Sequence, residues 1–116
     1  MLSFSPHITP ILLLLISNLF MTSAWYGHLK FPTASMITAI LVSWGLAFFE
    51  YCLAVPANRI GYSVYSAGQL KAMQEVISIV VFVGFSVVVL GEDMGLKQIF
   101  GFVLLAAGAF FVFDGG

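Results

Sequence analysis

Four long apolar windows, separated by short segments rich in polar residues, proline and glycine, dominate the chain. A transmembrane helix needs about 20 apolar residues, and the windows near residues 8–27, 33–55, 67–90 and 96–113 meet or approach that length. Within lipid, a segment must pair its own backbone groups, so each window is expected to be a helix. The pattern therefore predicts a single all-α membrane domain over residues 1–116, an integral bundle of four transmembrane helices.

Pro56 marks the expected end of the second window. Proline lacks a backbone N–H and disfavours helical geometry in the residue before it, so the helix is expected to stop at Val55 or within a residue or two. A loop from Pro56 to Ser66 would follow, on the same side of the membrane as both termini. The first window could instead be a signal peptide, but no basic segment precedes it, and we expect it to be retained.

Composition strengthens the membrane assignment and excludes several functions. Hydrophobic residues make up 61% of the chain and charged residues 8%, with a mean hydropathy of +1.10. So few charged side chains could not form the surface of a water-soluble domain. With four Lys and Arg in total, nucleic-acid binding is not expected. The one cysteine, Cys52, and the two histidines, His7 and His28, show no metal-ligand spacing. We therefore predict no metal, no cofactor and no enzymatic activity.

The charged residues at the membrane faces give no clear orientation. Arg59 and Lys71 lie towards the side of the termini, and Lys30 and Lys97 lie towards the other side. Because the bias of Lys and Arg between loops sets orientation, a balance of this kind permits either orientation or both. Two interpretations remain open at this stage: dual topology, and the simpler one that two or three charges are too few to indicate an orientation.

Two acids inside the apolar windows are the first candidates for a functional site. Glu50 precedes Pro56 by six residues and Glu75 follows Ala67 by eight, which places both roughly 9 to 12 Å from the same membrane face. An ionised carboxylate at such depth costs about 3 kcal/mol, so each acid must face the bundle, find a partner or stay protonated. Proton binding is the favoured interpretation. The alternative is that Lys71 neutralises Glu75 one helical turn away, or Glu50 across the helix pair, and the acids only hold helices together.

Other polar side chains fall at helical spacing near these acids. Lys71, Gln74 and Glu75 share one stripe of the third helix because they are three and four residues apart. Polar residues of the first window extend this set. The predicted substrate or proton site consists of Glu50, Glu75, Lys71, Gln74, Asn18 and Trp25.

Residues outside the windows suggest two further features. Asn58 and Arg59 lie in the expected middle loop, where they could gate the mouth of a path, although a loop arginine that touches lipid headgroups is the simpler interpretation. Glu92 and Asp93 are expected to cap the fourth helix and to complement its dipole.

Two glycines on the last helix predict a packing face. Gly101 and Gly108 are seven residues apart, so they lie on the same side of the helix with Leu104 and Leu105 between them. Small residues let two helix backbones approach closely in a membrane. We therefore expect this face to contact the fourth helix of a second copy.

The chain resembles a known family over almost its entire length. The segment from Phe85 to Phe113 resembles the closing helix pair of the drug/metabolite transporter (DMT) superfamily, in which a helix ends in Gly-Glu and the last helix carries two spaced glycines. Here these residues are Gly91, Glu92, Gly101 and Gly108. Three further segments are similar to the short, four-span, uncharacterised branch of that superfamily: "SAWYGHLK", "SWGLAFFEYCLAVPANRIGY" and "QLKAMQEVISIVVFV".

The resemblance implies a unit similar in size to the small multidrug resistance exporters. Those exporters work as antiparallel homodimers and use an essential glutamate in the first helix. The first window here has no acid, and the acids Glu50 and Glu75 lie in the second and third windows, so the exporter's glutamate has no counterpart.

The leading hypothesis is a small transporter or exporter of the bacterial inner membrane that works as a homodimer. Intramembrane glutamates would couple the flux of a small molecule or ion to protons, and access to a midplane site would alternate. Two alternatives remain: a dual-topology ion channel, in which hydroxyl and amide side chains would matter more than the acids, and a membrane scaffold without transport, in which polar residues only join helices.

Overall fold

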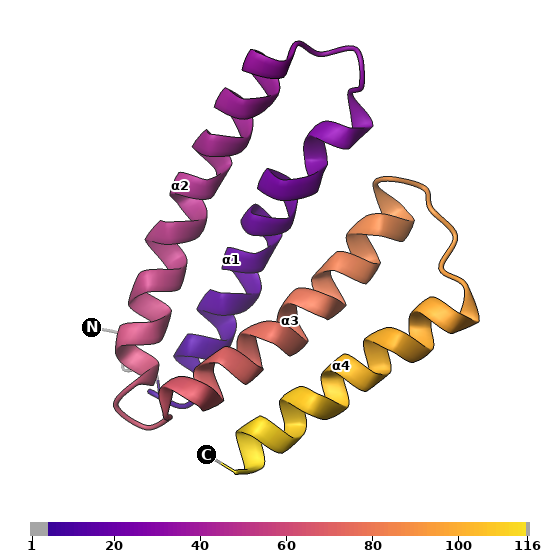
Figure 1. The fold of residues 1–116 in the computed structure, drawn as a ribbon. Helices are drawn as coiled ribbons and strands as arrows, with labels where there is room; N and C mark the ends of the chain where they lie inside the picture. The colour runs from indigo at the N-terminus through magenta and orange to yellow at the C-terminus, as the bar shows by residue number, and fades with distance from the viewer. Residues whose placement is uncertain (1–4, 116) are drawn as a thin grey trace.

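The computed structural model describes residues 5–115 and shows four long helices that alternate in direction (Figure 1). The helices are α1 (Thr9–Tyr26), followed by the short 3-10 helix η1 (Gly27–Lys30), α2 (Met36–Gly61), α3 (Ala67–Val88) and α4 (Leu96–Asp114). All four are long and apolar enough to cross a membrane, and the described residues contain no strand. The predicted all-α fold of four membrane-spanning helices is confirmed, and the chain is an integral, multi-pass membrane protein.

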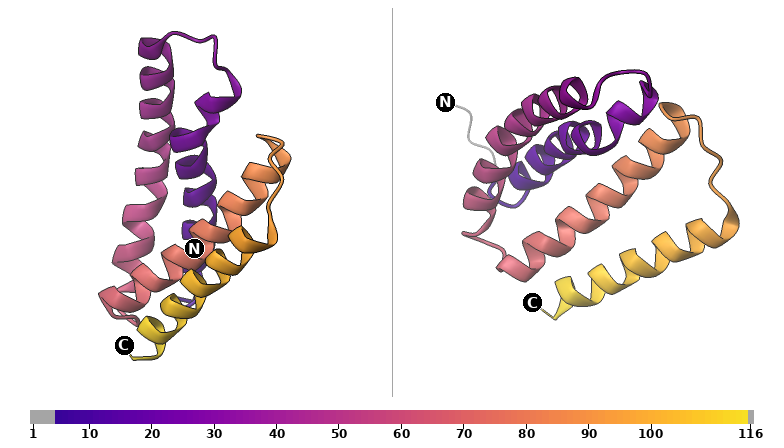
Figure 2. Two further views of the ribbon diagram at one scale, coloured as in Figure 1. Left: turned by 45° about the vertical axis from the view of Figure 1, so that its right-hand side comes forward. Right: turned by 45° about the horizontal axis from the view of Figure 1, so that its top comes forward.

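The helices lie side by side in the order α2, α1, α3, α4, which differs from their order along the chain (Figures 1 and 2). α1 packs most extensively on α2 and also on α3, whereas α4 packs mainly on α3. The extents of 45 × 38 × 20 Å describe a thin array rather than a closed bundle. α2 and α4 therefore form the outer edges, and most of their large hydrophobic side chains are exposed, as lipid-facing surfaces require.

The second helix runs through Pro56 and ends at Gly61, so the expectation that it stops near Val55 was wrong. Packing explains the difference. Ala57 is fully buried, and the Gly61 backbone approaches both Pro10 of α1 and Leu70 of α3. These contacts hold the last turns of α2 in place, and a single proline is tolerated in a transmembrane helix because its surroundings compensate for the lost hydrogen bond.

The end of the molecule that contains the α2–α3 connection is tied together by polar contacts. Ser66 and Gln69 form a reciprocal capping box at the start of α3. The Gln69 side-chain amide also donates to the Phe113 carbonyl near the end of α4, at 3.2 Å. The Tyr65 hydroxyl donates to the His7 carbonyl, at 2.9 Å. α1, α3 and α4 are thus joined at this end.

Contacts at the opposite end secure the end of α3. The Lys30 ammonium donates to the Val89 carbonyl at 2.7 Å, which links the α1–α2 connection to α3. The buried Ser86 hydroxyl donates to Glu92 Oε1 at 3.0 Å. Glu92 therefore folds back on α3, and the residue at the N-cap of α4 is Gly95, so the expected role of Glu92 and Asp93 in capping α4 was wrong.

Candidate functional site

A groove of about 750 Å³ lies between the second half of α2 and the first half of α3. Its wall on α2 repeats at helical spacing through Glu50, Ala54 and Asn58, and its wall on α3 includes Leu70 and Gln74. The full lining is Glu50, Tyr51, Ala54, Val55, Asn58, Arg59, Tyr62, Ala67, Leu70, Lys71 and Gln74. Carboxylate, amide, phenol and cationic groups thus line a groove within an otherwise apolar array.

Glu50 lies at the inner end of this groove, with 8% of its surface exposed. Because α2 continues to Gly61, Glu50 lies about 16 Å from that end of the helix, deeper than the sequence indicated. Ser17 of α1 is the side chain beside its carboxyl group. Ser17 Oγ nevertheless has no hydrogen-bond partner among the described residues, so the contact falls short of a hydrogen bond.

Asn18, which follows Ser17 in α1, is a second buried polar residue of this helix. Its side chain is fully buried, and its amide nitrogen donates to the Leu14 carbonyl of the same helix at 2.8 Å. Within the described part of the chain its oxygen, Oδ1, has no partner. Buried polar atoms are usually paired with protein or water. Among the described residues α1 therefore carries buried polar atoms without partners on Ser17, beside Glu50, and on Asn18, the next residue of the helix.

Glu75 lies elsewhere. Its carboxylate forms an ion pair with the Lys71 ammonium at 2.7 Å, one helical turn away, and both side chains are substantially exposed. Glu75 lines a smaller cavity of about 190 Å³ between α3 and α4, beside Leu105 and Ala109. The two intramembrane acids therefore face different gaps, and Lys71 borders both cavities.

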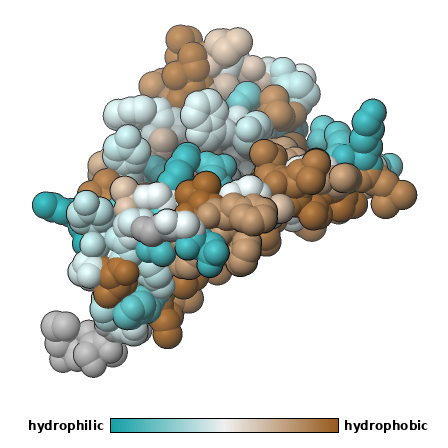
Figure 3. Space-filling model, turned by 60° about the horizontal axis from the view of Figure 1, so that its bottom comes forward, coloured by the Kyte–Doolittle hydropathy of each residue, from teal (hydrophilic) through white to brown (hydrophobic). Residues whose placement is uncertain are grey.

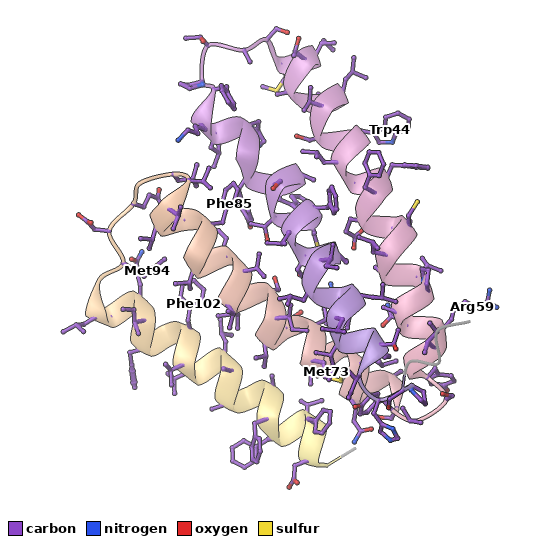
Figure 4. All side chains as sticks on the ribbon, turned by 180° about the vertical axis from the view of Figure 1, so that it is seen from behind. Trp44, Arg59, Met73, Phe85, Met94 and Phe102 are labelled. Carbon is purple, nitrogen blue, oxygen red and sulfur yellow. The ribbon has the colours of Figure 1, made fainter. Side chains whose placement is uncertain are left out.

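Asn58 and Arg59 lie on the last turns of α2, not in a loop. Both border the outer end of the groove. Figure 4 shows the Arg59 side chain pointing away from the helices, as does that of Trp44, which lies earlier in the same helix. Figure 3, which views the molecule from this end, shows polar side chains gathered beside a broad hydrophobic surface. The groove therefore has a polar outer end and a single carboxyl group at its inner end.

Gln74 and Trp25 lie in neighbouring cavities. Trp25 lines a second cavity of about 520 Å³ between α1 and α3, which Phe102 of α4 also borders. The Gln74 side-chain amide is 3.8 Å from Met21 Sδ, and Met21 lines this second cavity. The predicted set is thus divided: Glu50, Lys71 and Gln74 share the groove, while Trp25 belongs to the second cavity.

The two glycines of the Gly101 to Gly108 face of α4 have no neighbour among residues 5–115. A Cβ placed on either glycine would meet nothing within 4 Å. Of the described residues of α4, Ala109 alone is buried. The face is open to lipid or to another molecule.

Ser17, Met21 and Tyr51 contribute to the site although the sequence did not single them out. Each lies in an apolar window where serine, methionine and tyrosine are ordinary helix-packing residues. Ser17 precedes Asn18 directly, but nothing in one sequence shows that it faces Glu50 of a different helix. A partner across two helices can be found only once the packing is known.

The groove has the chemistry of a binding site for a small cationic or proton-carrying group. Its volume lies within the usual range of small-molecule sites, which are mostly apolar with a few polar groups. A buried carboxylate can hold a proton or a cation, and the Tyr51 and Tyr62 rings can contact a cation through their faces. In the described residues no three His, Cys, Asp or Glu side chains are placed to hold a metal ion.

The comparisons with known proteins give one match. The family model described as "Putative member of DMT superfamily (DUF486)" matches residues 10–113. Neither the curated proteins nor the solved structures gave a match. Membership of this superfamily and the four apolar helices fit a membrane transporter. Because the match covers nearly all of the chain, the protein belongs to this family of the drug/metabolite transporter superfamily.

Proposed function

We propose that the protein is a small membrane transporter that carries organic cations through the α2–α3 groove and couples their movement to protons at Glu50. The observation that carries the proposal is the position of Glu50. Among the described residues it is the only ionisable side chain that is buried, and it lies at the inner end of the α2–α3 groove. Ionisable groups inside a membrane domain are costly and therefore usually functional.

The geometry supports an exchange between a proton and a cation. A protonated Glu50 is neutral and fits a buried position, whereas an ionised Glu50 needs a positive partner. Among the described residues Lys71 is paired with Glu75, and Arg59 points outward. A cationic substrate can supply the missing charge. Proton and substrate would then compete for the same carboxyl group.

A homodimer is part of this proposal. The array is one helix thick in places, and the groove is open on one side, so one copy does not enclose a path. α2 and α4 are edge helices with large exposed apolar faces. A second copy, packed against the open Gly101 to Gly108 face, would cover part of this surface. The two copies could be parallel or antiparallel. A bacterial inner membrane is the proposed location.

Flux measurements on purified protein in proteoliposomes test the proposal. A panel of organic cations, zwitterions and inorganic ions would be applied with a pH-sensitive dye inside the vesicles. We expect saturable flux of at least one organic cation and an opposing proton movement. Non-saturating ion currents would instead favour a channel. Absence of flux across the panel, with protein that is folded and inserted, would favour a scaffold without transport.

A further inference from the structure

The α1–α3 cavity is a second space within the membrane domain, with a mostly apolar lining that includes two hydroxyl side chains. Its volume is about 520 Å³, and it is lined by Met21, Thr22, Trp25, Ser78, Phe82 and Phe102, among others. Thr22 is buried, with 3% of its surface exposed, and Ser78 is half-buried. Hydroxyl groups placed in a membrane domain commonly pair with backbone or line a space that water can enter.

This cavity and the α2–α3 groove lie along one face of α3. Lys71 and Gln74 line the groove, and Ser78 and Phe82 line the cavity. Residues four apart occupy the same side of a helix, about 6 Å from each other. Gln74 and Ser78 are therefore successive positions on a single stripe, although they border different spaces.

The two spaces extend towards opposite ends of the molecule. The groove reaches the α2–α3 connection, where Tyr62 and Ala67 line it. The cavity reaches the end of α1, where Trp25 and Tyr26 line it. Aromatic side chains of this kind favour the headgroup region. Each space therefore has an outer end near a different membrane surface.

Gln74, which lines the groove, contacts Met21, which lines the cavity. The Gln74 amide nitrogen lies 3.8 Å from Met21 Sδ. A thioether sulfur is a weak acceptor, and methionine is a flexible side chain, so the contact can break at low cost. Ser17 Oγ and Asn18 Oδ1, which precede Met21 by about one turn of α1, are fully buried and lack partners among residues 5–115. They offer acceptors to water or substrate when the contact opens.

We infer that the α1–α3 cavity is the second half of one substrate path and that the Gln74–Met21 contact is the barrier between the two halves. The inference rests on the proposed transport function, because it identifies the α1–α3 cavity as the exit of the proposed transport path. Glu50 and Gln74 both line the groove, so a substrate bound at the carboxyl group would reach the cavity once this contact parts. Thr22 and Ser78 would then give hydrogen bonds to its polar groups.

Single cysteines test the inference without any transport assay. With Cys52 replaced by alanine, Ala54→Cys would report on the groove and Ser78→Cys on the cavity. Proteoliposomes carrying an N-terminal tag would be treated outside with a membrane-impermeant thiol reagent and then with a protease. The protease removes the tag only from chains whose termini lie outside the vesicle. The two orientations therefore differ in size and can be scored separately on one gel.

We expect the reagent to label Ala54→Cys in chains that lose the tag and Ser78→Cys in chains that keep it. Adding Gln74→Ala or Met21→Ala should abolish this preference, so that each cysteine is labelled in both orientations. Met73→Ala is the matched control, because Met73 is also on α3 but lines an apolar pocket with Ile11 and Phe110, and it should leave the preference intact.

Labelling of both cysteines from the same side, no labelling of Ser78→Cys, or an unchanged preference in both barrier variants would overturn the inference. These outcomes are independent of flux. Loss of transport with the expected labelling would count against the transport proposal alone.

Discussion

At the scale of single residues, the two intramembrane acids differ in their surroundings. Glu75 has an ion-pair partner on its own helix, Lys71, whereas the side chain beside the Glu50 carboxyl group is Ser17 of another helix. The sequence located both acids and also the Lys71–Glu75 pairing, because a spacing of four residues on one helix is local information. The sequence could not show that the two acids face different cavities, because that depends on which sides of α3 face α1 and α4.

The Ser86 hydroxyl is expected to stabilise the end of α3. It is fully buried and donates to a carboxylate, Glu92 Oε1, at 3.0 Å. Ser86→Ala removes this bond and should lower the free energy of unfolding by about 1 to 2 kcal/mol. Ser63→Ala is the control, because Ser63 is exposed and donates only to the Ile60 carbonyl in its own turn. Unfolding in detergent would measure both variants, and equal effects would contradict the assignment.

At the scale of helices, the existence of all four could be predicted but the end of α2 could not. Long apolar windows in lipid have few alternatives to a helix, and this requirement acts within each window. The rule that placed the helix end at Pro56 describes a local preference. The burial of Ala57 and the close approach at Gly61 override it, and both depend on α1 and α3.

Gly61 is expected to be required for this packing. A Cβ at this position would lie 2.6 Å from Leu70 Cδ2 and 3.2 Å from the Pro10 ring. Leu70 is buried and the proline ring is rigid, so Gly61→Ala should destabilise the protein by about 1 to 2 kcal/mol.

Gly45→Ala is the matched control for that substitution. Gly45 lies on the same helix, and a Cβ there meets nothing within 4 Å. Alanine is a better helix former than glycine, so this variant should be neutral or more stable by up to about 1 kcal/mol. Thermal unfolding of the two variants would decide, and a stable Gly61→Ala protein would show that α2 does not pack as described.

At the scale of the whole molecule, the order α2, α1, α3, α4 was not predictable from the sequence. Apolar residues surround each helix on nearly all sides, so periodicity does not reveal which face packs on protein and which on lipid. Trp44 and Leu14 are both apolar, yet Trp44 is 72% exposed and Leu14 is fully buried. The arrangement leaves α4 with one main neighbour, α3.

The open face of α4 leads to a prediction about assembly. Gly101→Leu combined with Gly108→Leu should reduce the dimer population in bilayers, because leucine side chains keep two helix backbones apart. Gly84→Leu is a suitable control, since Gly84 is also without a neighbour within 4 Å but lies on α3. Single-molecule photobleaching would count the copies. An unchanged dimer population in the double variant would exclude this interface.

The most direct test of the central claim compares Glu50→Gln with Glu75→Gln in the proteoliposome flux assay. Glutamine keeps the shape of either side chain but cannot ionise, and unfolding and dimer measurements would confirm that both variants are intact. We predict that Glu50→Gln abolishes proton-linked flux, because Glu50 is the buried acid of the groove. Glu75→Gln should retain it, because Glu75 faces α4 in an exposed ion pair. Normal proton-linked flux in Glu50→Gln, or loss of flux in Glu75→Gln alone, would contradict the account.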